Sequence, residues 1–170
     1  MGALLLVRLS LEVLQALRHG DLDAASRMAG VRLTSYFVEH DWLWDIRIAQ
    51  LQRDPTAQEW IARAAVEHDT VVGHVGFHGP PDELGMVEVA YSVEPGLRRR
   101  GYATKMLDAA LTWAYADPEV AVVRATVSPD NLASLATLAA FRFELVGDQW
   151  DEEDGLELVY ELPRVNLAGG

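Results

Sequence analysis

Residues 87–104 read VEVAYSVEPGLRRRGYAT, and this stretch decides the fold. Apolar side chains at every second position from Val87 to Val93 predict a strand with two different faces. Pro95 ends the strand, and a basic loop with Gly101 leads into a helical pattern of apolar residues that continues to Ala114. A helix that starts directly after such a loop offers free backbone N–H groups to an anion such as phosphate.

The loop and first helical turn, residues 98–104, form the candidate anion site. Gly101 lets the backbone approach a ligand closely, Ala103 is small, and Thr104 adds a hydroxyl group. Three neighbouring arginines repel one another unless something anionic lies beside them. A solvated basic turn is the alternative, and the residues alone leave both interpretations open. The full set is Arg98, Arg99, Arg100, Gly101, Tyr102, Ala103 and Thr104.

The rest of the chain predicts an α/β protein. Apolar periodicity and turn residues indicate strands at 3–9, 60–66, 70–77, 85–93, 121–127, 143–150 and 156–162, and helices at 11–18, 22–28, 41–53, 102–116 and 131–140. The helix that starts at Asp41 carries Trp42, Ile46 and Ala49 on one face. The strand–helix–strand unit over 85–127 predicts a parallel crossover, whereas the flanking strands are predicted to pair as antiparallel hairpins.

Length and composition set limits on the function. A chain of 170 residues without an internal repeat predicts one domain over 1–163, followed by a tail over 164–170. The net charge of −12 excludes general nucleic-acid binding and suits cationic partners such as amines. The absence of cysteine excludes a Cys acyl-enzyme, and the five scattered histidines predict no metal site. No apolar run reaches membrane-spanning length, so we expect a cytoplasmic protein with no membrane partner.

Three segments together resemble the GNAT family of acetyl-CoA-dependent N-acetyltransferases: the strand 87–95, the loop Arg98-x-x-Gly101-x-Ala103, and Asn131-x-x-Ser134. The resemblance follows the order of elements along the whole chain and is most similar to the branch of ribosomal-protein N-terminal acetyltransferases. It implies the GNAT acyl-CoA N-acyltransferase fold, an α+β arrangement with a central mixed, mostly antiparallel, splayed sheet flanked by helices.

The resemblance also implies roles for individual residues. The backbone of Tyr91, Ser92 and Val93 is expected to pair with the pantetheine amides of acetyl-CoA, and residues 98–104 are expected to hold its pyrophosphate. Asn131 is expected to hydrogen-bond the pantetheine arm, and Ser134 to stabilise the leaving thiolate. A backbone N–H near Tyr91–Val93 would stabilise the oxyanion of the tetrahedral intermediate.

The acceptor amine must lose a proton before it can attack, and a nearby carboxylate can take that proton. Glu88 matches the position where many members of the family keep a basic glutamate. A solvated glutamate on the wet face of the strand is the alternative interpretation. His78 is the second candidate base because its ordinary pKa suits the task, whereas His74, inside a strand, is expected to be structural.

Three positions depart from the family pattern. Leu138 stands where many members have a general-acid tyrosine, which leaves Ser134, water or Tyr160 for that role. Thr126 replaces a fifth-strand glutamate that some protein N-acetyltransferases use as base. Arg142 replaces a glycine after the last helix, so it either adopts a left-handed conformation or the helix ends differently.

The resemblance therefore implies transfer of an acetyl group to a primary amine, and the absence of cysteine favours direct attack in a ternary complex. The acceptor is a protein N-terminus, an aminoglycoside-type antibiotic or a small amine, and a homodimer is compatible with the family. The alternative is a catalytically weak CoA-binding regulatory module. Aromatic residues at 36–44 are expected to be mostly core. The acidic run 148–154 is typical of a solvated hairpin tip, although a cationic substrate would suit it.

Overall fold

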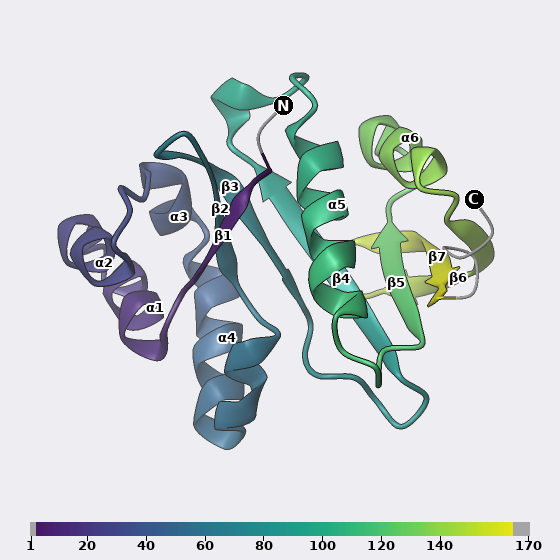
Figure 1. The fold of residues 1–170 in the computed structure, drawn as a ribbon, viewed down its shortest axis with the longest axis horizontal. Coiled ribbons are helices and arrows are strands. Elements are labelled where there is room, and N and C mark those ends of the chain that lie inside the picture. Colours follow the sequence, from purple (N-terminus) through teal and green to yellow (C-terminus); the bar gives the residue numbers. More distant parts are fainter. Residues whose placement is uncertain (1–2, 165–170) are drawn as a thin grey trace.

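A seven-stranded sheet with the strand order β1-β2-β3-β4-β5-β7-β6 forms the centre of the computed structural model, which describes residues 3–164 (Figure 1). The strands are β1 (Leu5–Arg8), β2 (Arg63–Glu67), β3 (Thr70–Phe77), β4 (Met86–Val93), β5 (Val122–Val127), β6 (Glu144–Asp151) and β7 (Gly155–Pro163). The helices are α1 (Leu11–Arg18), α2 (Leu22–Ala29), α3 (Ser35–Glu39), α4 (Asp41–Arg53), α5 (Tyr102–Tyr115) and α6 (Leu132–Ala140). Only β4 and β5 pair in parallel, as the crossover through α5 requires. The predicted mixed, mostly antiparallel sheet is therefore confirmed.

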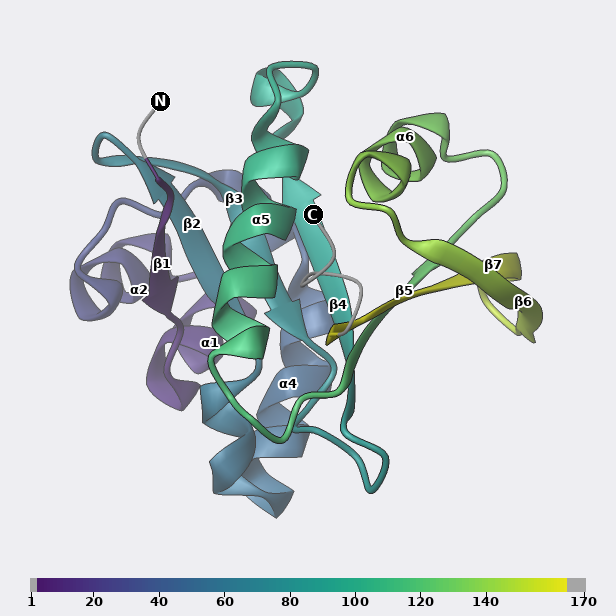
Figure 2. The same cartoon turned by 45° about the vertical axis from the view of Figure 1, so that its right-hand side comes forward.

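Two apolar cores lie on opposite faces of the sheet. The first lies beneath α5 and α6 and includes Met106, Leu107 and Leu138. The second lies beneath α1–α4 and includes Leu14, Phe37 and Trp44. Figure 2 shows the α5 layer in front of the sheet with α6 standing beside β5. The two faces of β4 thus look toward different layers, because successive side chains of a strand point to opposite sides.

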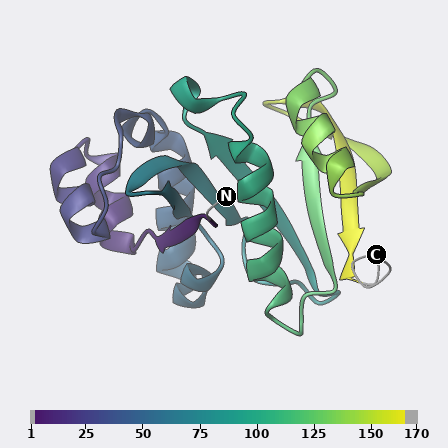
Figure 3. The same ribbon diagram turned by 45° about the horizontal axis from the view of Figure 1, so that its top comes forward.

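The strands β4 and β5 separate along their length. They pair only over Met86–Glu88 with Val122–Arg124, whereas β4 remains paired with β3 up to Val93. Their upper ends lie apart in Figure 1, and in Figure 3 β5 and the yellow β7 lie to the right of α5. The predicted splay is confirmed, and it begins at Glu88.

Several boundaries differ from the sequence-based expectation. The strand predicted at 60–66 begins at Arg63, because the 3-10 turn Pro55–Glu59 and the positive φ of Ala62 (27°) delay it. The short helix α3 was not predicted. Trp42, Ile46 and Ala49 do share a face of α4, but that face is exposed, and Trp44 is buried instead.

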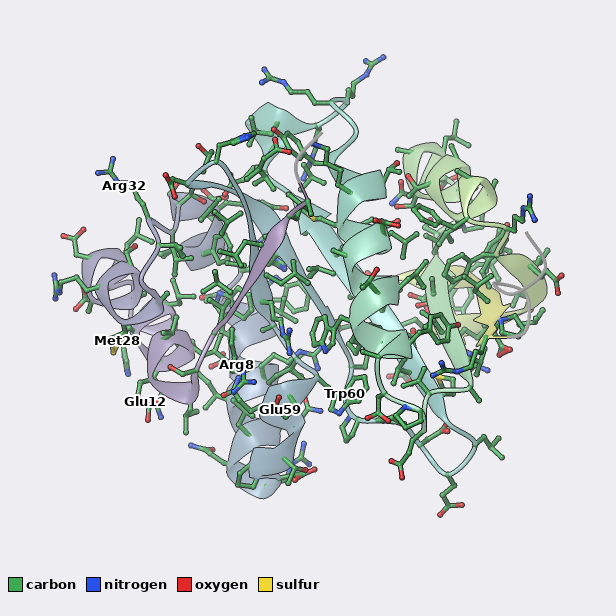
Figure 4. All side chains as sticks on the ribbon, in the orientation of Figure 1. Arg8, Glu12, Met28, Arg32, Glu59 and Trp60 are labelled. Carbon is green, nitrogen blue, oxygen red and sulfur yellow. The ribbon has the colours of Figure 1, made fainter. Side chains whose placement is uncertain are left out.

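The two ends of the described chain are tied to the body of the protein. Arg8 of β1 forms an ion pair with Glu59 at 2.7 Å, and Figure 4 shows the two residues side by side. Arg164 was expected to start the tail. Its guanidinium instead donates to the carbonyl oxygens of Tyr115, Asp117 and Val120, so the packed region extends one residue further. The remaining tail, 165–170, lies outside the described residues.

Candidate active site

The gap between β4 and β5 exposes backbone that no neighbouring strand satisfies. From Val89 to Val93 the backbone of β4 bonds to β3 on one side, and its β5 side has no ladder partner. A strand edge with free N–H and C=O groups can pair with a ligand that carries amide groups. Tyr91, Ser92 and Val93, predicted to pair with pantetheine, lie on this edge.

The N-terminus of α5 begins at the end of this gap, directly after the basic loop. Gly101 has a φ of 84° and Arg99 a φ of 64°, so two left-handed residues turn the backbone into the helix. No side chain caps the helix, and its first turn holds no acidic residue. A Cβ added at Gly101 would meet nothing within 4 Å, which leaves the space above the turn open. This cradle suits the pyrophosphate of a CoA molecule.

The three arginines of the loop have different surroundings. The Arg98 guanidinium donates to the Val93 carbonyl oxygen and to the Tyr36 hydroxyl, each at 3.3 Å, and so fastens the loop to the end of β4 and to α3. Arg99 and Arg100 are exposed. Tyr102 and Lys105, in the first turn of α5, both bind Glu67. Two of the three arginines therefore remain available to an anion.

Glu88 lies where β4 and β5 begin to part, with a side chain that is 19% exposed. Its Oε1 accepts a hydrogen bond from the Thr126 hydroxyl at 2.8 Å, and its Oε2 lies 3.6 Å from Nδ1 of His78. Burial lowers the pKa of His78, and the Glu88 carboxylate opposes that shift. The two candidate bases therefore form one pair, which Thr126 holds in place from the neighbouring strand.

On the opposite face of β4, the hydroxyl group of Tyr91 meets that of Ser134 in α6. Tyr91 is three residues from Glu88, and its side chain packs against the core beneath α5 and α6. Burial raises the pKa of Tyr91, and a hydrogen bond with Ser134 partly opposes that shift. Asn131 accepts from the Ser134 N–H at 3.2 Å and so caps α6. Leu138 is completely buried in the core.

A cavity of about 640 Å³ opens on the Glu88 face of the sheet. Its walls come from α4, β3, β4 and the β6–β7 hairpin, and they include Trp42, His74, His78, Glu88, Asp154 and Glu157. His74, which was expected to be structural, is 7% exposed, and burial lowers its pKa to about 3. Among residues 3–164, no group of His, Asp or Glu could hold a metal ion and no helix could span a membrane.

The predicted residues thus gather around one gap. The end of β4 and the cradle lie on one side of the gap, the start of α6 lies beyond β5 on the other side, and Glu88 faces the cavity. The sequence did not reveal the bond from Thr126 to Glu88 or the contact of the Tyr91 side chain with Ser134. The alternation of side chains along β4 puts Tyr91 and Glu88 on opposite faces of the strand. The sequence therefore indicated the direction of Tyr91, but not its contact with Ser134.

Comparison with known proteins fits this arrangement. The chain belongs to the GNAT acetyltransferase family, because the model of the acetyltransferase (GNAT) domain matches residues 5–144. It is 36% identical over 75 residues to the uncharacterized N-acetyltransferase YjdG of Bacillus subtilis (strain 168), a match that covers 44% of this chain and 45% of that protein.

Solved structures share the fold. Mycobacterium smegmatis RimJ in complex with CoA-disulfide has a TM-score of 0.68 and 17% identity, over 98% of this chain and 88% of that one. The aminoglycoside acetyltransferase AAC(6')-Ib with paromomycin and acetyl-CoA has a TM-score of 0.68 and 16% identity, over 99% and 97%. A chimera of the spermidine N-acetyltransferase SpeG from Vibrio cholerae and hSSAT reaches 0.67 and 14%, over 99% and 100%.

Proposed function

We propose that the protein transfers an acetyl group from acetyl-CoA directly to a primary amine in a ternary complex. The observation that carries this proposal is the parting of β4 and β5 at Glu88. The gap leads from an uncapped, basic helix N-terminus on one side to a carboxylate at a cavity on the other. When bound, acetyl-CoA supplies an activated acyl group with a thiolate leaving group.

The cofactor side of the site binds and orients. The N–H groups at the start of α5 and the exposed Arg99 and Arg100 hold the pyrophosphate. The free edge of Tyr91–Val93 pairs with the pantetheine amides and gives an N–H to the oxyanion. Asn131, whose Oδ1 already caps α6, keeps its amide N–H groups for the pantetheine arm.

The chemistry needs a proton to leave the amine and a proton to reach the sulfur. Glu88 takes the first, directly or through His78, on the cavity face of β4. Ser134, beside the Tyr91 hydroxyl on the opposite face, stabilises the thiolate and returns a proton. Burial raises the pKa of Tyr91, so its hydroxyl stays protonated at neutral pH and can donate. The buried Leu138 takes no part.

The second candidate, a CoA-binding module without catalysis, is favoured by Leu138 at the position of the general acid. The two candidates differ in one measurement. Purified protein is mixed with acetyl-CoA and a panel of amines and N-terminal peptides, and the release of free CoA is followed. Release that depends on the amine supports the transferase. Tight acetyl-CoA binding without release supports the module.

A further inference from the structure

Only every second residue of β4 turns its backbone groups toward the gap. At the start of the strand, the His78 N–H donates to the Glu88 carbonyl oxygen at 2.9 Å. Just past its end, the Glu94 N–H donates to the Val72 carbonyl oxygen at 2.8 Å. The ladder between these two bonds has no register shift, so even-numbered residues of β4 bond to β3 and odd-numbered residues face the other side. The residues that face the gap are therefore Val89, Tyr91 and Val93.

The last of these gap-facing carbonyl oxygens already has a donor. Arg98, in the basic loop, donates from its Nε to the Val93 carbonyl oxygen at 3.3 Å. The side chain therefore reaches back from the loop to the end of the free edge. A pantetheine amide that pairs with Val93 in the manner of a strand donates its N–H to this same oxygen. One acceptor thus lies within reach of two donors, the Arg98 guanidinium and the arm of acetyl-CoA.

A tyrosine of α3 holds the guanidinium in this position. The Tyr36 hydroxyl accepts from Nη2 of Arg98 at 3.3 Å and lies 2.5 Å from Oγ of Ser92. Tyr36 is 9% exposed, so its hydroxyl group is fixed from the acceptor side of the sheet. Val93 and Tyr36 together give Arg98 two acceptors, and neither of them carries a charge.

The Arg98 side chain is exposed and has no counter-ion. Within residues 3–164, none of the ion pairs includes Arg98. A hydrogen bond from a guanidinium to a phosphate oxygen is roughly twice as strong as one between neutral groups. A pyrophosphate at the start of α5 lies only a few residues from Arg98 along the chain. The guanidinium is therefore stabilised if it leaves Val93 and Tyr36 for that pyrophosphate.

We propose that Arg98 determines the specificity for the donor, because it makes the site select a pantetheine thioester that carries a pyrophosphate. The guanidinium competes with the pantetheine amide for the Val93 carbonyl oxygen, and the pyrophosphate draws the guanidinium away. A donor without phosphate has to displace the guanidinium and offers it no new partner. This inference rests on the proposed function, because it concerns the donor of that reaction.

The first test measures binding and needs no turnover. Pantetheine, which lacks the phosphates, is titrated into isotope-labelled protein and followed by NMR, with and without inorganic pyrophosphate. Saturating pyrophosphate is expected to raise the affinity for pantetheine about 5-fold, because the guanidinium then leaves the Val93 carbonyl oxygen. If the two ligands bind independently, or if pyrophosphate weakens pantetheine binding, the proposal is wrong.

Two variants separate the competition from the loss of charge. Arg98→Met removes both, so pantetheine should bind about 5-fold more tightly, without a response to pyrophosphate, and CoA about 5-fold more weakly. Tyr36→Phe loosens the guanidinium and keeps its charge, so pantetheine and CoA should both bind about 3-fold more tightly. Arg32→Met removes an exposed arginine outside the site (Figure 4) and should leave both affinities unchanged.

The same contrast is expected in turnover. The donors are S-acetyl-pantetheine and acetyl-CoA with one accepted amine, and the released thiol is measured. The protein adds no background to this assay, because it has no cysteine. Arg98→Met should lower KM for S-acetyl-pantetheine and raise KM for acetyl-CoA, with little change in kcat. A merely structural role of Arg98 would move both KM values in the same direction.

The outcomes keep the two proposals apart. If CoA binds but no amine releases thiol from either donor, the transferase function fails, and the binding series still decides the role of Arg98. If Arg98→Met weakens both pantetheine and CoA, the guanidinium supports the edge instead of competing for it. The specificity inference is then wrong while the transferase stands. Weaker binding of both ligands by Tyr36→Phe, at an unchanged Tm, would also overturn the inference.

Discussion

The two faces of β4 take their partners from different elements of the fold. On the face toward α5 and α6, Tyr91 meets Ser134, and the strand runs directly into the basic loop and α5. On the cavity face, Ser92 bonds to Tyr36 at 2.5 Å, 56 residues away, and Glu88 bonds to Thr126, 38 residues away. The basic loop and α5 continue directly from β4, whereas the partners of Ser92 and Glu88 come from α3 and β5.

This difference has a functional meaning. The proposed pyrophosphate cradle consists of a strand end, a loop and a helix start that follow one another in the chain, so its backbone geometry is set locally. The acceptor cavity depends on how α4 and the β6–β7 hairpin pack against the sheet. Substitutions in α4 or the hairpin can therefore change the acceptor while leaving the cofactor cradle intact.

The largest expected effect is on the cofactor face. Gly101→Asp places a carboxylate in the open space above the start of α5. At about 4 Å from a phosphate, a like charge costs about 4 kcal/mol, so acetyl-CoA affinity by calorimetry should fall roughly 1000-fold. Gly101→Ala keeps the backbone strain without the charge and should bind much better. Unchanged binding by Gly101→Asp would remove the cradle from this loop.

The next largest effect is expected at Glu88, where β4 and β5 begin to part. Glu88→Gln should lower kcat by roughly 100-fold, because the amide cannot take the proton of the amine. Acetyl-CoA affinity should stay the same, since Glu88 faces the cavity. Glu83→Gln, an exposed loop residue, serves as the control. A mutant with near-normal kcat at neutral pH would pass the role of base to His78 or to water.

His74 tests the stability of the acceptor face. Its pKa is about 3 in the folded protein, mainly through burial, against an ordinary value of 6.5, so between these pH values the unfolded chain binds the extra proton. The free energy of unfolding should therefore fall as pH drops, by about 2 kcal/mol from pH 6.5 to pH 5.

The measurement is urea denaturation at both pH values. His74→Phe keeps an aromatic ring and should reduce the loss on acidification by that amount. The exposed-histidine variant His19→Gln should retain the full loss. An identical pH dependence in His74→Phe and the parent would contradict the assignment.

Tyr91 tests the opposite face of the strand with a smaller effect. Tyr91→Phe removes one of two neighbouring hydroxyl groups, so kcat should fall about 10-fold, below the usual range for loss of a full acid catalyst. Tyr160→Phe is the matched control, because Tyr160 was the other tyrosine considered for this role. If Tyr160→Phe lowers kcat and Tyr91→Phe does not, the assignment is reversed.

The smallest effect lies at the end of α6. Arg142 has a φ of 63°, so the chain adopts the left-handed conformation that glycine favours. Arg142→Gly should stabilise the protein by about 0.5 kcal/mol, a rise of one or two degrees in Tm. Arg142→Ala should give no such gain, because it keeps the Cβ. A lower Tm for the glycine variant would mean that the arginine side chain contributes more than its backbone costs.

Local signals predicted much of the fold. The apolar stripe of α5 and the bounds of α1 were predicted from residues near in sequence, whereas the left-handed conformation of Arg142 was one of two alternatives that the family pattern left open. Each depends on helix periodicity or on terminal hydrogen bonds, which act within a few residues. The β4–β5 splay was predicted from the family resemblance alone, because nothing local reveals where two strands part.

Contacts across the molecule could not be predicted. Trp42 and Trp44 are both apolar and two residues apart, and only the packing of α4 decides that Trp44 is buried and Trp42 is exposed. Thr126 was noted as a missing glutamate, and its hydroxyl instead orients Glu88. The acidic hairpin tip is exposed, as expected, and the sequence could not show that Asp151 and Asp154 also line the cavity.

The short pairing of β4 with β5 also has a mechanical consequence. In the described chain, three residue pairs are the whole strand ladder that joins β1–β4 to β5–β7. The sheet therefore consists of two parts, β1–β4 and β5–β7, which a short parallel ladder joins. A ligand that pairs with the free edge of β4 would add hydrogen bonds beside this ladder and limit movement between the two parts of the sheet. Slower amide exchange along β4 and β5 in the presence of CoA would reveal this stiffening directly.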